Sequence, residues 1–573
     1  MTRRFMLIAS ALVLIAALVG GTIGRSRRFR HSVPTNGAVS HAEAGDIEKD
    51  YNEAIEAISE EYAGDIDYEK ATQAAIQGML STLDPHSMYF PYNEFKKLRE
   101  DQDSKFFGIG VTIVQHRDGV YIQSAVEDTP AGRLGLRYGD RILEVDGEDA
   151  RDWSSEQVSK KVRGGKGEPV TIKVDRAGSE APLTFTVIRD LVPLPSIRNA
   201  YMLRPGTGYI GLTGGFQSTS DEELREALDK LKDQGMRQVI LDMRGNPGGL
   251  LNQAIDVASE FLPRGLVVVS VKGRTEYSDP IVYKSTGADP EDVPLVVLIN
   301  RGTASASEIV AGAIQDHGRG LIVGETSFGK GLVQHVFLLP FSTGLTLTTA
   351  RYYTPYGRSL QRDYSSGSLY DYYTRHEDDT RAQGSASASG SPTSRNAEAT
   401  PAQPVSTPHP QSGPAVKTAA GRVFYGGGGI TPDIDIKPVV FSQLKNRIAE
   451  AAFQFTRQLA AGRVAGLESY KVERVQYGRN PKASDYPIND RVLDAFRSFV
   501  RTDTASQLAP AQLDEELDFV KLRLREEIVT AAYSNDAGAR VLLDSDPQVL
   551  RALEALPDAK RLAETARSEE LRS

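Results

Sequence analysis

The sequence predicts an α/β protein built from several domains. Strand and helix patterns alternate from about residue 195 onward, short strands with alternating apolar residues fill residues 105–192, and apolar residues at helical spacing mark the segments before and after them. A chain of 573 residues has room for about three to five domains. We therefore expect a multidomain fold with a mainly parallel sheet in its α/β core.

The composition excludes several classes of function. The 67 Lys and Arg residues are outnumbered by 76 Asp and Glu residues, so the chain lacks the basic excess that a nucleic-acid partner requires. The absence of Cys from the sequence rules out disulfides, a thiol nucleophile, an iron–sulfur cluster and a Cys-ligated zinc. The eight His residues form no H-E-x-x-H motif. We expect no nucleic acid, no metal and no other cofactor.

One apolar segment bears on location. Phe5 to Gly24 is a run of 20 uncharged residues, close to the roughly 20 that span a bilayer core. Arg3 and Arg4 precede the run and favour a cytoplasmic N-terminus, although four Arg residues follow it. The run exceeds the apolar core of a cleavable signal, about 7 to 15 residues. Residues 1–30 are predicted to hold a single-pass inner (cytoplasmic) membrane anchor, with the later domains outside the cytoplasm in the cell envelope; a cleaved signal is the alternative.

Shifts in composition divide the rest of the chain. Residues 31–45 are predicted to be a linker, 46–98 a helical N-terminal unit and 99–193 a β-rich domain. Residues 194–365 and 421–439 are predicted to form one α/β core, interrupted at 366–420 by an insertion rich in Ser, Pro and Gly that is predicted to be disordered. Residues 440–573 are helical and highly charged. We expect this last region to pack on the core or to support a homo-oligomer.

Two residues of the α/β core are candidates for catalysis. Ser305 follows the predicted strand 295–300 and opens a helix, while Lys330 follows the next predicted strand, 321–325. A strand–helix–strand crossover makes such strands parallel, so both residues should meet at the sheet edge where ligands of open α/β sheets bind. A serine at a helix start beside a lysine predicts a Ser/Lys dyad. The alternatives are a helix capping box formed by Ser305 and Glu308, and a solvated loop lysine.

The dyad makes two demands on its surroundings. Lys330 must act as a neutral base, so desolvation has to lower its pKa from about 10.4 to about 7. The oxyanion needs backbone donors, and the sequence offers Ala306 at the helix start together with Gly248 and Gly249 in a glycine-rich loop. A tight turn is the alternative explanation of that loop. A phosphate loop at residues 324–331 is disfavoured, because residue 331 is Gly where a Ser or Thr hydroxyl is required.

These motifs together resemble a known family. Residues 303–334, with S-A-S-E and F-G-K-G-L-V-Q, resemble the signature of the carboxyl-terminal processing proteases, which are tail-specific Ser/Lys endopeptidases. The similarity runs over about residues 46–435 outside the insertion and includes LDMRGNPGGLL and ARYYTPYGRSLQ. The resemblance implies that Ser305 is the nucleophile, Lys330 the general base and Gln334 the residue that orients the lysine. It also implies a crotonase-like catalytic core with an inserted PDZ domain.

The β-rich residues 99–193 correspond to the implied PDZ domain. In such domains a terminal carboxylate binds backbone N–H groups of a glycine-containing loop, an apolar side chain packs beside a helix, and the peptide adds a strand to the sheet edge. The corresponding residues here are Gly108, Ile109, Gly110, Val111, Val158 and Val162. Arg163 could report peptide binding to the catalytic domain, and a solvated helix-end arginine is the alternative.

The predicted function is that of an extracytoplasmic serine endopeptidase. It would recognise free C-terminal tails of proteins or peptides through its PDZ domain and cleave them by a Ser/Lys dyad through an acyl-enzyme. A catalytically silent PDZ scaffold, in which Ser305 only caps a helix, is the alternative from a different class. An acyl-CoA enzyme of the crotonase type is suggested by fold alone, which does not determine function.

Overall fold

The computed structural model describes residues 44–102, 105–274, 280–364, 413–418, 421–479, 481–482 and 484–570. It divides into two units, residues 1–72 and residues 73–573. In the first unit, helix α2 (Ala44–Glu61) exposes Ile47, Tyr51 and Ile55, which recur at helical spacing. Helix α3 (Tyr68–Ser81) begins in this unit and continues into the second one.

The structure does not support the predicted membrane anchor. In the part of the chain that the structure describes, no helix is both long enough and apolar enough to cross a bilayer. The most apolar helices there, α8 (Leu251–Ser259) and α9 (Ala306–Asp316), have 9 and 11 residues, about half the length that a membrane span requires. Residues 5–24, on which the prediction rested, lie outside the described residues. The predicted inner-membrane localisation is therefore corrected.

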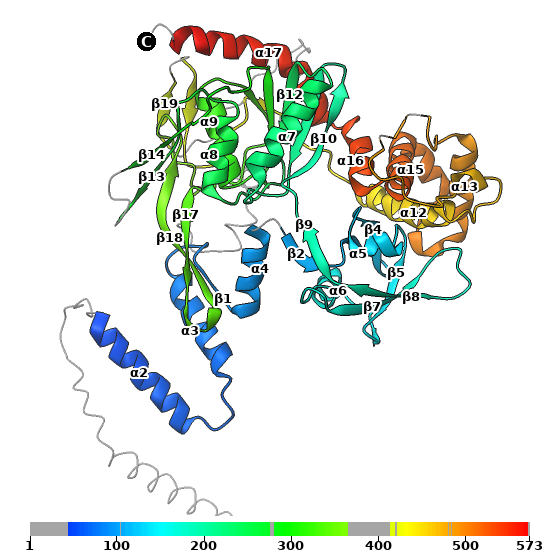
Figure 1. Ribbon diagram of the computed structural model, residues 1–573, viewed down its shortest axis with the longest axis horizontal. Helices are drawn as coiled ribbons and strands as arrows, with labels where there is room; N and C mark the ends of the chain where they lie inside the picture. Colours follow the sequence, from blue (N-terminus) through cyan, green and yellow to red (C-terminus); the bar gives the residue numbers. More distant parts are fainter. Residues whose placement is uncertain are drawn as a thin grey trace, which may run out of the picture. The chain divides into compact units, whose positions relative to one another are not determined.

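The core of the second unit is a six-stranded sheet in the order β10-β11-β12-β15-β16-β21, and all its pairs except β10 with β11 are parallel. Its strands are β10 (Ile197–Arg204), β11 (Thr207–Leu212), β12 (Gln238–Asp242), β15 (Leu295–Ile299), β16 (Leu321–Gly324) and β21 (Ile434–Asp435). Val297 belongs to an apolar cluster with residues of α7 (Ser220–Asp233), α8 and α9, whereas its neighbours Val296 and Leu298 belong to a cluster with residues of α17 (Pro547–Glu570). Figure 1 shows the course of these helices around the sheet. Helices therefore cover both faces, as the continuous apolar strands predicted.

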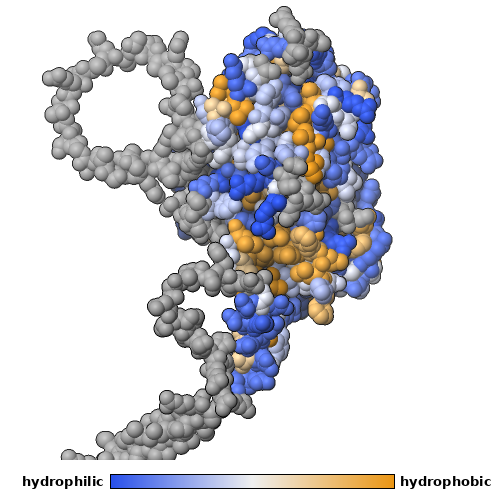
Figure 2. All heavy atoms as spheres, turned by 90° about the vertical axis from the view of Figure 1, so that its left-hand side faces the viewer, coloured by the Kyte–Doolittle hydropathy of each residue, from blue (hydrophilic) through white to orange (hydrophobic). Residues whose placement is uncertain are grey.

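A second sheet lies beside this core. Its order is β1-β18-β13-β14, with β17 paired to β18. The strands are β1 (Met88–Phe90), β13 (Val267–Gly273), β14 (Ile281–Lys284), β17 (Leu332–Leu338) and β18 (Gly344–Tyr353), followed along the chain by the β19 (Ala415–Lys417) and β20 (Val423–Tyr425) pair. Figure 2 shows an apolar area across the face on which β17 and β18 lie, and Val336, Phe337 and Leu338 of β17 are exposed. Strand β19 lies inside the range that the sequence predicted to be a disordered insertion.

The β-rich domain is a separate antiparallel sheet in the order β3-β4-β5-β7-β8, with β6 paired to β5. Its elements are β3 (Val111–His116), β4 (Gly119–Ala125), α5 (Pro130–Leu134), β5 (Arg141–Val145), β6 (Glu148–Asp149), α6 (Ser155–Val162), β7 (Pro169–Asp175) and β8 (Leu183–Ile188). The strand pair β2 (Lys105–Gly108) and β9 (Asp190–Pro193) stands where the chain enters and leaves the domain, after helix α4 (Tyr92–Gln102). This pairing closes the domain as an insertion between α4 and the core (Figure 1).

Helices of the C-terminal region pack against the β-rich domain (Figure 1). The helices of this region before α17 are α12 (Gln443–Ala460), α13 (Asp490–Thr502), α14 (Pro510–Glu515), α15 (Leu517–Ala532) and α16 (Asn535–Leu543), of which α12 and α15 contact the β-rich domain. The short 3₁₀ turns among the described residues are Pro340–Ser342, Glu468–Tyr470 and Thr504–Ser506. Tyr121 and Tyr138 of the β-rich domain are buried in the same apolar cluster as α12 and α15. His116 Nδ1 lies 2.6 Å from Glu450 Oε2, which adds a polar contact to this interface. Self-association of the region stays a prediction.

Candidate active site

Ser305 occupies a strained position between β15 and α9. Its φ and ψ are 55° and −116°, outside the regions that a side-chain-bearing residue ordinarily adopts, and the residue is buried. Its side chain makes no capping hydrogen bond to α9; the N–H of Ser305 instead donates to Glu308 Oε2 at 2.8 Å. Such a conformation costs about 1–3 kcal/mol and persists where the surrounding structure enforces it, commonly at functional sites. Capping of α9 therefore does not explain the hydroxyl of Ser305.

Lys330 lies in the loop between β16 and β17 and is partly buried. Its Nζ donates to Gln334 Oε1 at 3.1 Å, and Gln334 Nε2 donates in turn to the carbonyl oxygen of His86 at 2.6 Å. Desolvation lowers the pKa of Lys330, and the negative charges of Glu308 and Asp84 oppose part of that effect. Lys330 is thus held in place by a neutral acceptor in surroundings that favour its neutral form.

The contact with Gln334 was not derivable from sequence spacing. Four strand residues cover about 13 Å, too far for these two side chains to meet along a regular strand. In the structure β17 begins only at Leu332, and its pairing with β18 shifts register between Val333 and Gln334. The irregular start of the strand brings Gln334 back to Lys330.

Ser305 and Lys330 line one cleft, with a volume of about 1150 Å³. Strands β15 and β16 are parallel neighbours, and Ile299 pairs with Gly324 at their carboxyl ends. The two following loops are tied together, because the N–H of Phe328 donates to the carbonyl oxygen of Thr303 at 2.9 Å. The sheet topology therefore places the two loops beside each other, as the crossover argument expected.

The glycine-rich loop after β12 lies against Ser305. A Cβ atom on Gly248, whose φ is +95°, would stand 2.7 Å from both Ser305 Cβ and the carbonyl oxygen of Ala304. Gly248 N–H donates to Asn246 Oδ1 at 2.9 Å, so its hydrogen is already engaged within the loop. Among the hydrogen bonds of the described residues, the N–H groups of Ala306 and Gly249 have no such acceptor. These two are the better placed donors of the three that the sequence proposed.

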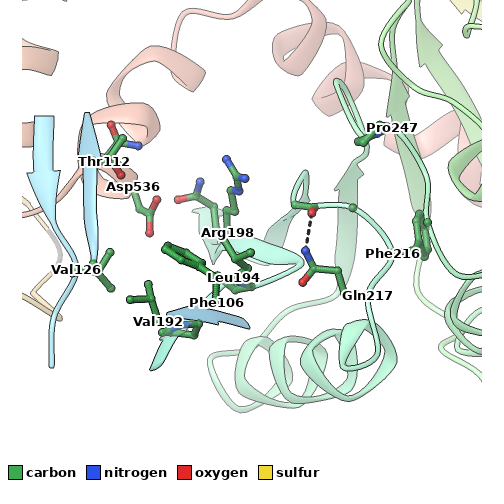
Figure 3. A pocket seen from close by; sticks show the side chains of 18 of the residues that line it. Phe106, Thr112, Val126, Val192, Leu194, Arg198, Phe216, Gln217, Pro247 and Asp536 are labelled. Atoms are coloured by element: carbon green, nitrogen blue, oxygen red, sulfur yellow. Dashed lines mark hydrogen bonds between the residues drawn. The ribbon is translucent and has the colours of Figure 1, made fainter. Parts of the chain in front are cut away.

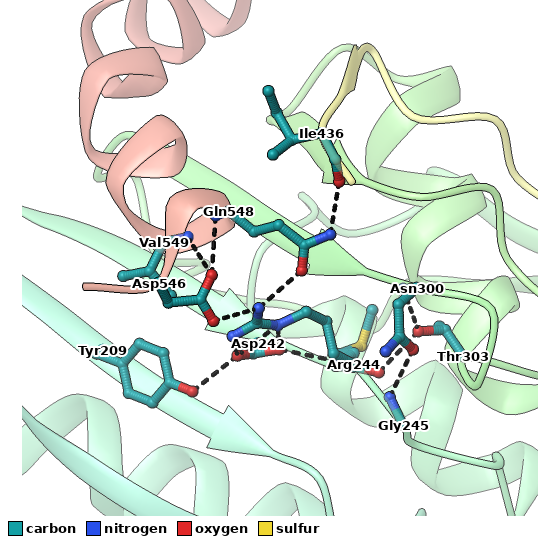
Figure 4. A network of polar contacts seen from close by, with 11 residues as sticks. Tyr209, Asp242, Arg244, Gly245, Asn300, Thr303, Ile436, Asp546, Gln548 and Val549 are labelled. Atoms are coloured by element: carbon teal, nitrogen blue, oxygen red, sulfur yellow. Dashed lines mark hydrogen bonds and ion pairs between the residues drawn. The ribbon is translucent and has the colours of Figure 1, made fainter. Parts of the chain in front are cut away.

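A polar network anchors this loop to the C-terminal helix (Figure 4). Arg244 donates to Asp242 at the end of β12, and its Nη1 donates to Asp546 Oδ2 at 2.7 Å and to Gln548 Oε1 at 2.8 Å. Asn300 Oδ1 accepts from Gly245 N–H at 2.8 Å on the other side of the loop. The first turn of α17 is therefore part of the scaffold beneath the glycine-rich loop, a role that the sequence did not indicate.

The same cleft extends to the β-rich domain (Figure 3). Thr112 and Val126 line it from that domain, Phe216 and Pro247 line it from the core, and Asp536 lines it from α16. Figure 3 shows Thr112 and Val126 on the opposite side from Phe216 and Pro247. The C-terminal region, in which sequence reasoning found no chemistry, thus forms part of the wall.

The structure places the predicted peptide-binding residues in three different settings. Gly110 and Val111 line the cleft, and only Gly fits at position 110, because its φ is +82° and a Cβ would stand 2.3 Å from Thr129 Oγ1. Val158 and Val162 are instead buried in the core of the β-rich domain, as is Ile109. Val158 and Val162 on the inner side of α6, together with Ile109 before β3, complete the small apolar core of this domain. Gly108 belongs to β2, where it pairs with Asp190.

Arg163 follows α6 and also lines the cleft. Its guanidinium carbon lies 4.2 Å from the ring centroid of Phe106. The position differs from that of a solvated helix-end arginine, since Nη1 is buried and has no hydrogen-bond partner in the described part of the chain.

Three family descriptions match successive parts of the chain. The Activating protease CtpB N-terminal domain matches residues 22–93, the PDZ domain matches residues 98–175, and Peptidase family S41 matches residues 206–372. The carboxy-terminal-processing protease of Bartonella bacilliformis is 35% identical over 314 residues, which is 54% of this chain and 72% of that protein. The chain belongs to the carboxyl-terminal processing proteases.

Other members of this family give the same result. The carboxyl-terminal-processing protease of Synechocystis is 37% identical over 51% of this chain and 69% of its own length. The carboxy-terminal processing protease CtpB of Bacillus subtilis is 33% identical over 57% of this chain and 70% of its own length. The resemblance noted at residues 303–334 is confirmed, and this carboxyl-terminal processing protease is a serine-type peptidase with a PDZ domain.

Proposed function

We propose that this protein is an endopeptidase that binds the free C-terminal tail of a polypeptide and cleaves upstream of it with a Ser305–Lys330 dyad. The observation that carries the proposal is the shared cleft, which runs from the edge of the PDZ domain to both residues. The strained backbone of Ser305 and the desolvation of Lys330 support the roles of nucleophile and base. A crotonase-like core is part of the proposal, supported by the parallel order β11-β12-β15-β16.

The mechanism follows from these positions. Ser305 Oγ attacks the scissile carbonyl carbon while neutral Lys330 Nζ takes the hydroxyl proton. The negative charge that develops on the carbonyl oxygen is stabilised by the N–H groups of Ala306 and Gly249, with Gly248 shaping the loop. Lys330 then gives its proton to the leaving amine, and an acyl group remains on Ser305 Oγ. Water, deprotonated by Lys330, releases the acyl group, and Gln334 keeps the lysine directed toward the reaction throughout.

Tail capture is assigned to the PDZ domain. An extended peptide would add a strand beside β3, with its carboxylate near the N–H groups of the loop at Gly108–Gly110. Val111 and Thr112 line the cleft at this edge, so a bound tail would lie in the same cavity as Ser305. Arg163 stacks on Phe106 in this cavity and would sense whether a tail is present.

One experiment tests this proposal as a whole. A disordered protein is incubated with the enzyme, and the cut ends are mapped by mass spectrometry, with the Ser305→Ala variant as control. A matched pair of peptides, one with a free C-terminal carboxylate and one amidated, is cleaved in parallel. We expect internal cuts that require Ser305 and a rate at least several-fold lower for the amides. Equal rates for acids and amides would reject carboxylate capture, whereas the absence of any cut would favour a silent PDZ scaffold.

A further inference from the structure

Glu308 is a buried carboxylate that contacts both halves of the dyad. It is the third residue of α9 and has no exposed surface. Its Oε2 accepts from the N–H groups of Ser305 and Lys330, both at 2.8 Å. Its Oε1 accepts from Gly329 N–H at 2.7 Å and from Ser327 Oγ at 2.5 Å. One side chain thus joins the turn that carries the nucleophile to the loop that carries the base.

The four partners fit an ionised carboxylate. The three backbone N–H groups can only donate, and Ser327 Oγ already accepts from Ile430 N–H at 2.6 Å, which leaves its own proton for Glu308. The position near the N-terminus of α9 also favours a negative charge. Burial raises the pKa of Glu308, while these same hydrogen bonds lower it. A carboxylate that accepts four donors is held in one orientation and cannot move without freeing several of them.

We propose that Glu308 is a positioning residue of the dyad, which fixes the separation of Ser305 and Lys330 by accepting from the backbone N–H groups of both. The inference rests on the proposed function, since it assumes that these two residues react together. The oxygen shared by Ser305 N–H and Lys330 N–H is its central observation. The sequence alone indicated only a capping-box role for Glu308.

The contacts of Glu308 extend to the segment that follows the predicted insertion. Ser327 N–H donates to the carbonyl oxygen of Ile430 at 3.0 Å, and Ile430 N–H returns a bond to Ser327 Oγ. Ile430 is fully buried. A shift of the glycine-rich segment 426–429, which leads into Ile430, would therefore move Ser327. Through Ser327 it would also move Glu308 and the two residues of the dyad.

Glu308 also contributes a charge near the base. The groups that influence the titration of Lys330 are Glu308 on α9 and Asp84 before β1, and His86 faces Lys330 from the same segment as Asp84. The pKa of His86 is lowered to about 4, chiefly by desolvation, so His86 is neutral near pH 7. Removing the charge of Glu308 should therefore lower the pKa of Lys330 further, with only Asp84 left to oppose desolvation.

The test compares Glu308→Gln with two other variants of the full chain by measuring kcat and KM across pH. Gln keeps the size of the side chain but offers one acceptor oxygen in place of two, so kcat should fall on the order of tenfold to a hundredfold with little change in KM. The acidic limb of the kcat/KM profile should move to lower pH. Glu308→Asp keeps the charge but not the reach, so kcat should fall while the limb stays in place.

Asp316→Asn is the matched control. Asp316 is a buried carboxylate at the other end of the same helix and pairs with Arg358 at 2.5 Å, away from the dyad. Asp316→Asn should lower the melting temperature but should change neither kcat nor the acidic limb of the kcat/KM profile. If Asp316→Asn changed kcat as much as Glu308→Gln at equal loss of stability, the role of Glu308 would be structural only, and the inference would be overturned.

Two further results keep the test decisive. Ser327→Ala removes one hydrogen-bond donor to Glu308 and no charge, and it should lower kcat at least threefold. This variant serves as the test if substitutions at Glu308 itself prevent folding. A wild-type kcat in Ser327→Ala would overturn the inference. Ser305→Ala is included in the same assay. A fully active Ser305→Ala would refute the proposed function itself, whereas an inactive Ser305→Ala beside a wild-type-like Glu308→Gln would refute only the role of Glu308.

Discussion

A substitution at Gly248 tests how the glycine-rich loop supports Ser305, the proposed nucleophile. In Gly248→Ala the new methyl group would stand 2.7 Å from Ser305 Cβ and from the carbonyl oxygen of Ala304, and 2.9 Å from the nitrogen of Ala306. Two of these atoms belong to the backbone, so the loop or the start of α9 must shift. The φ of +95° adds strain of about 1–3 kcal/mol, and overpacking adds about 1–3 kcal/mol more.

Gly245→Ala in the same loop separates strain from displacement. Gly245 has a φ of +70°, but a Cβ there meets no atom within 4 Å. Both variants should therefore lose stability through backbone strain, while only Gly248→Ala should push on Ser305 and Ala306. Loss of one oxyanion donor typically lowers kcat by about 10²–10³. We expect a decrease of that order in Gly248→Ala and near-normal kcat in Gly245→Ala.

The assay is steady-state cleavage of a peptide with a free carboxylate, with the melting temperature of each variant measured by circular dichroism. We predict that the two variants differ far more in kcat than in melting temperature. If Gly248→Ala were folded and cleaved the peptide as fast as Gly245→Ala does, the loop would not shape the site around Ser305.

The remaining predictions concern the groups that hold the site. Gln334→Ala removes the acceptor of Lys330 Nζ and should lower kcat about tenfold to a hundredfold in steady-state kinetics, with unchanged kcat as the contrary result. Asp546→Asn weakens the ion pair with Arg244 and should lower kcat several-fold. Arg567→Ala, near the far end of α17, is the control and should leave kcat unchanged. Equal kcat values in the two variants would show that the Arg244–Asp546 contact does not support the site. Lys330→Met should raise the melting temperature at neutral pH, because burial lowers the pKa of Lys330 and protonation then favours unfolding. The stability of the wild type should rise with pH between that lowered pKa and the ordinary lysine value of about 10.4. The difference in melting temperature between Lys330→Met and the wild type should therefore shrink across this pH range. A difference that did not change with pH would contradict the prediction.

The sequence predicted the parts of the site that depend on local pattern and strand connection. Buried strands with an intervening helix sufficed to place the loops of Ser305 and Lys330 beside each other, because a crossover of this kind has one common geometry. The glycine-rich loop could likewise be placed at the end of β12. Its donors could not be ranked, because the side chain of Asn246 takes the N–H of Gly248 and only the folded loop shows that contact.

Contacts between distant segments could not be predicted in this way. The irregular start of β17 that returns Gln334 to Lys330 leaves no periodic signal, and His86 lies 248 residues from the side chain that it binds. Asp546 and Gln548, at the start of α17, lie 302 and 304 residues from Arg244, which they bind. The apolar residues of α17 cover the second face of the sheet. The charged composition of the C-terminal region concealed this role, because only the inner side of the helix is apolar.

The most direct test of the account is the cleavage rate of Ser305→Ala, Ser307→Ala and Lys330→Arg, measured with one peptide at equal enzyme concentration. Ser307 is fully buried, and its Oγ donates to the carbonyl oxygen of Asn246, so it controls for loss of a neighbouring hydroxyl. We predict that Ser305→Ala and Lys330→Arg lose nearly all activity, since a guanidinium cannot act as a base near pH 7, and that Ser307→Ala retains it. Cleavage by Lys330→Arg or Ser305→Ala at the wild-type rate would contradict the Ser305–Lys330 dyad.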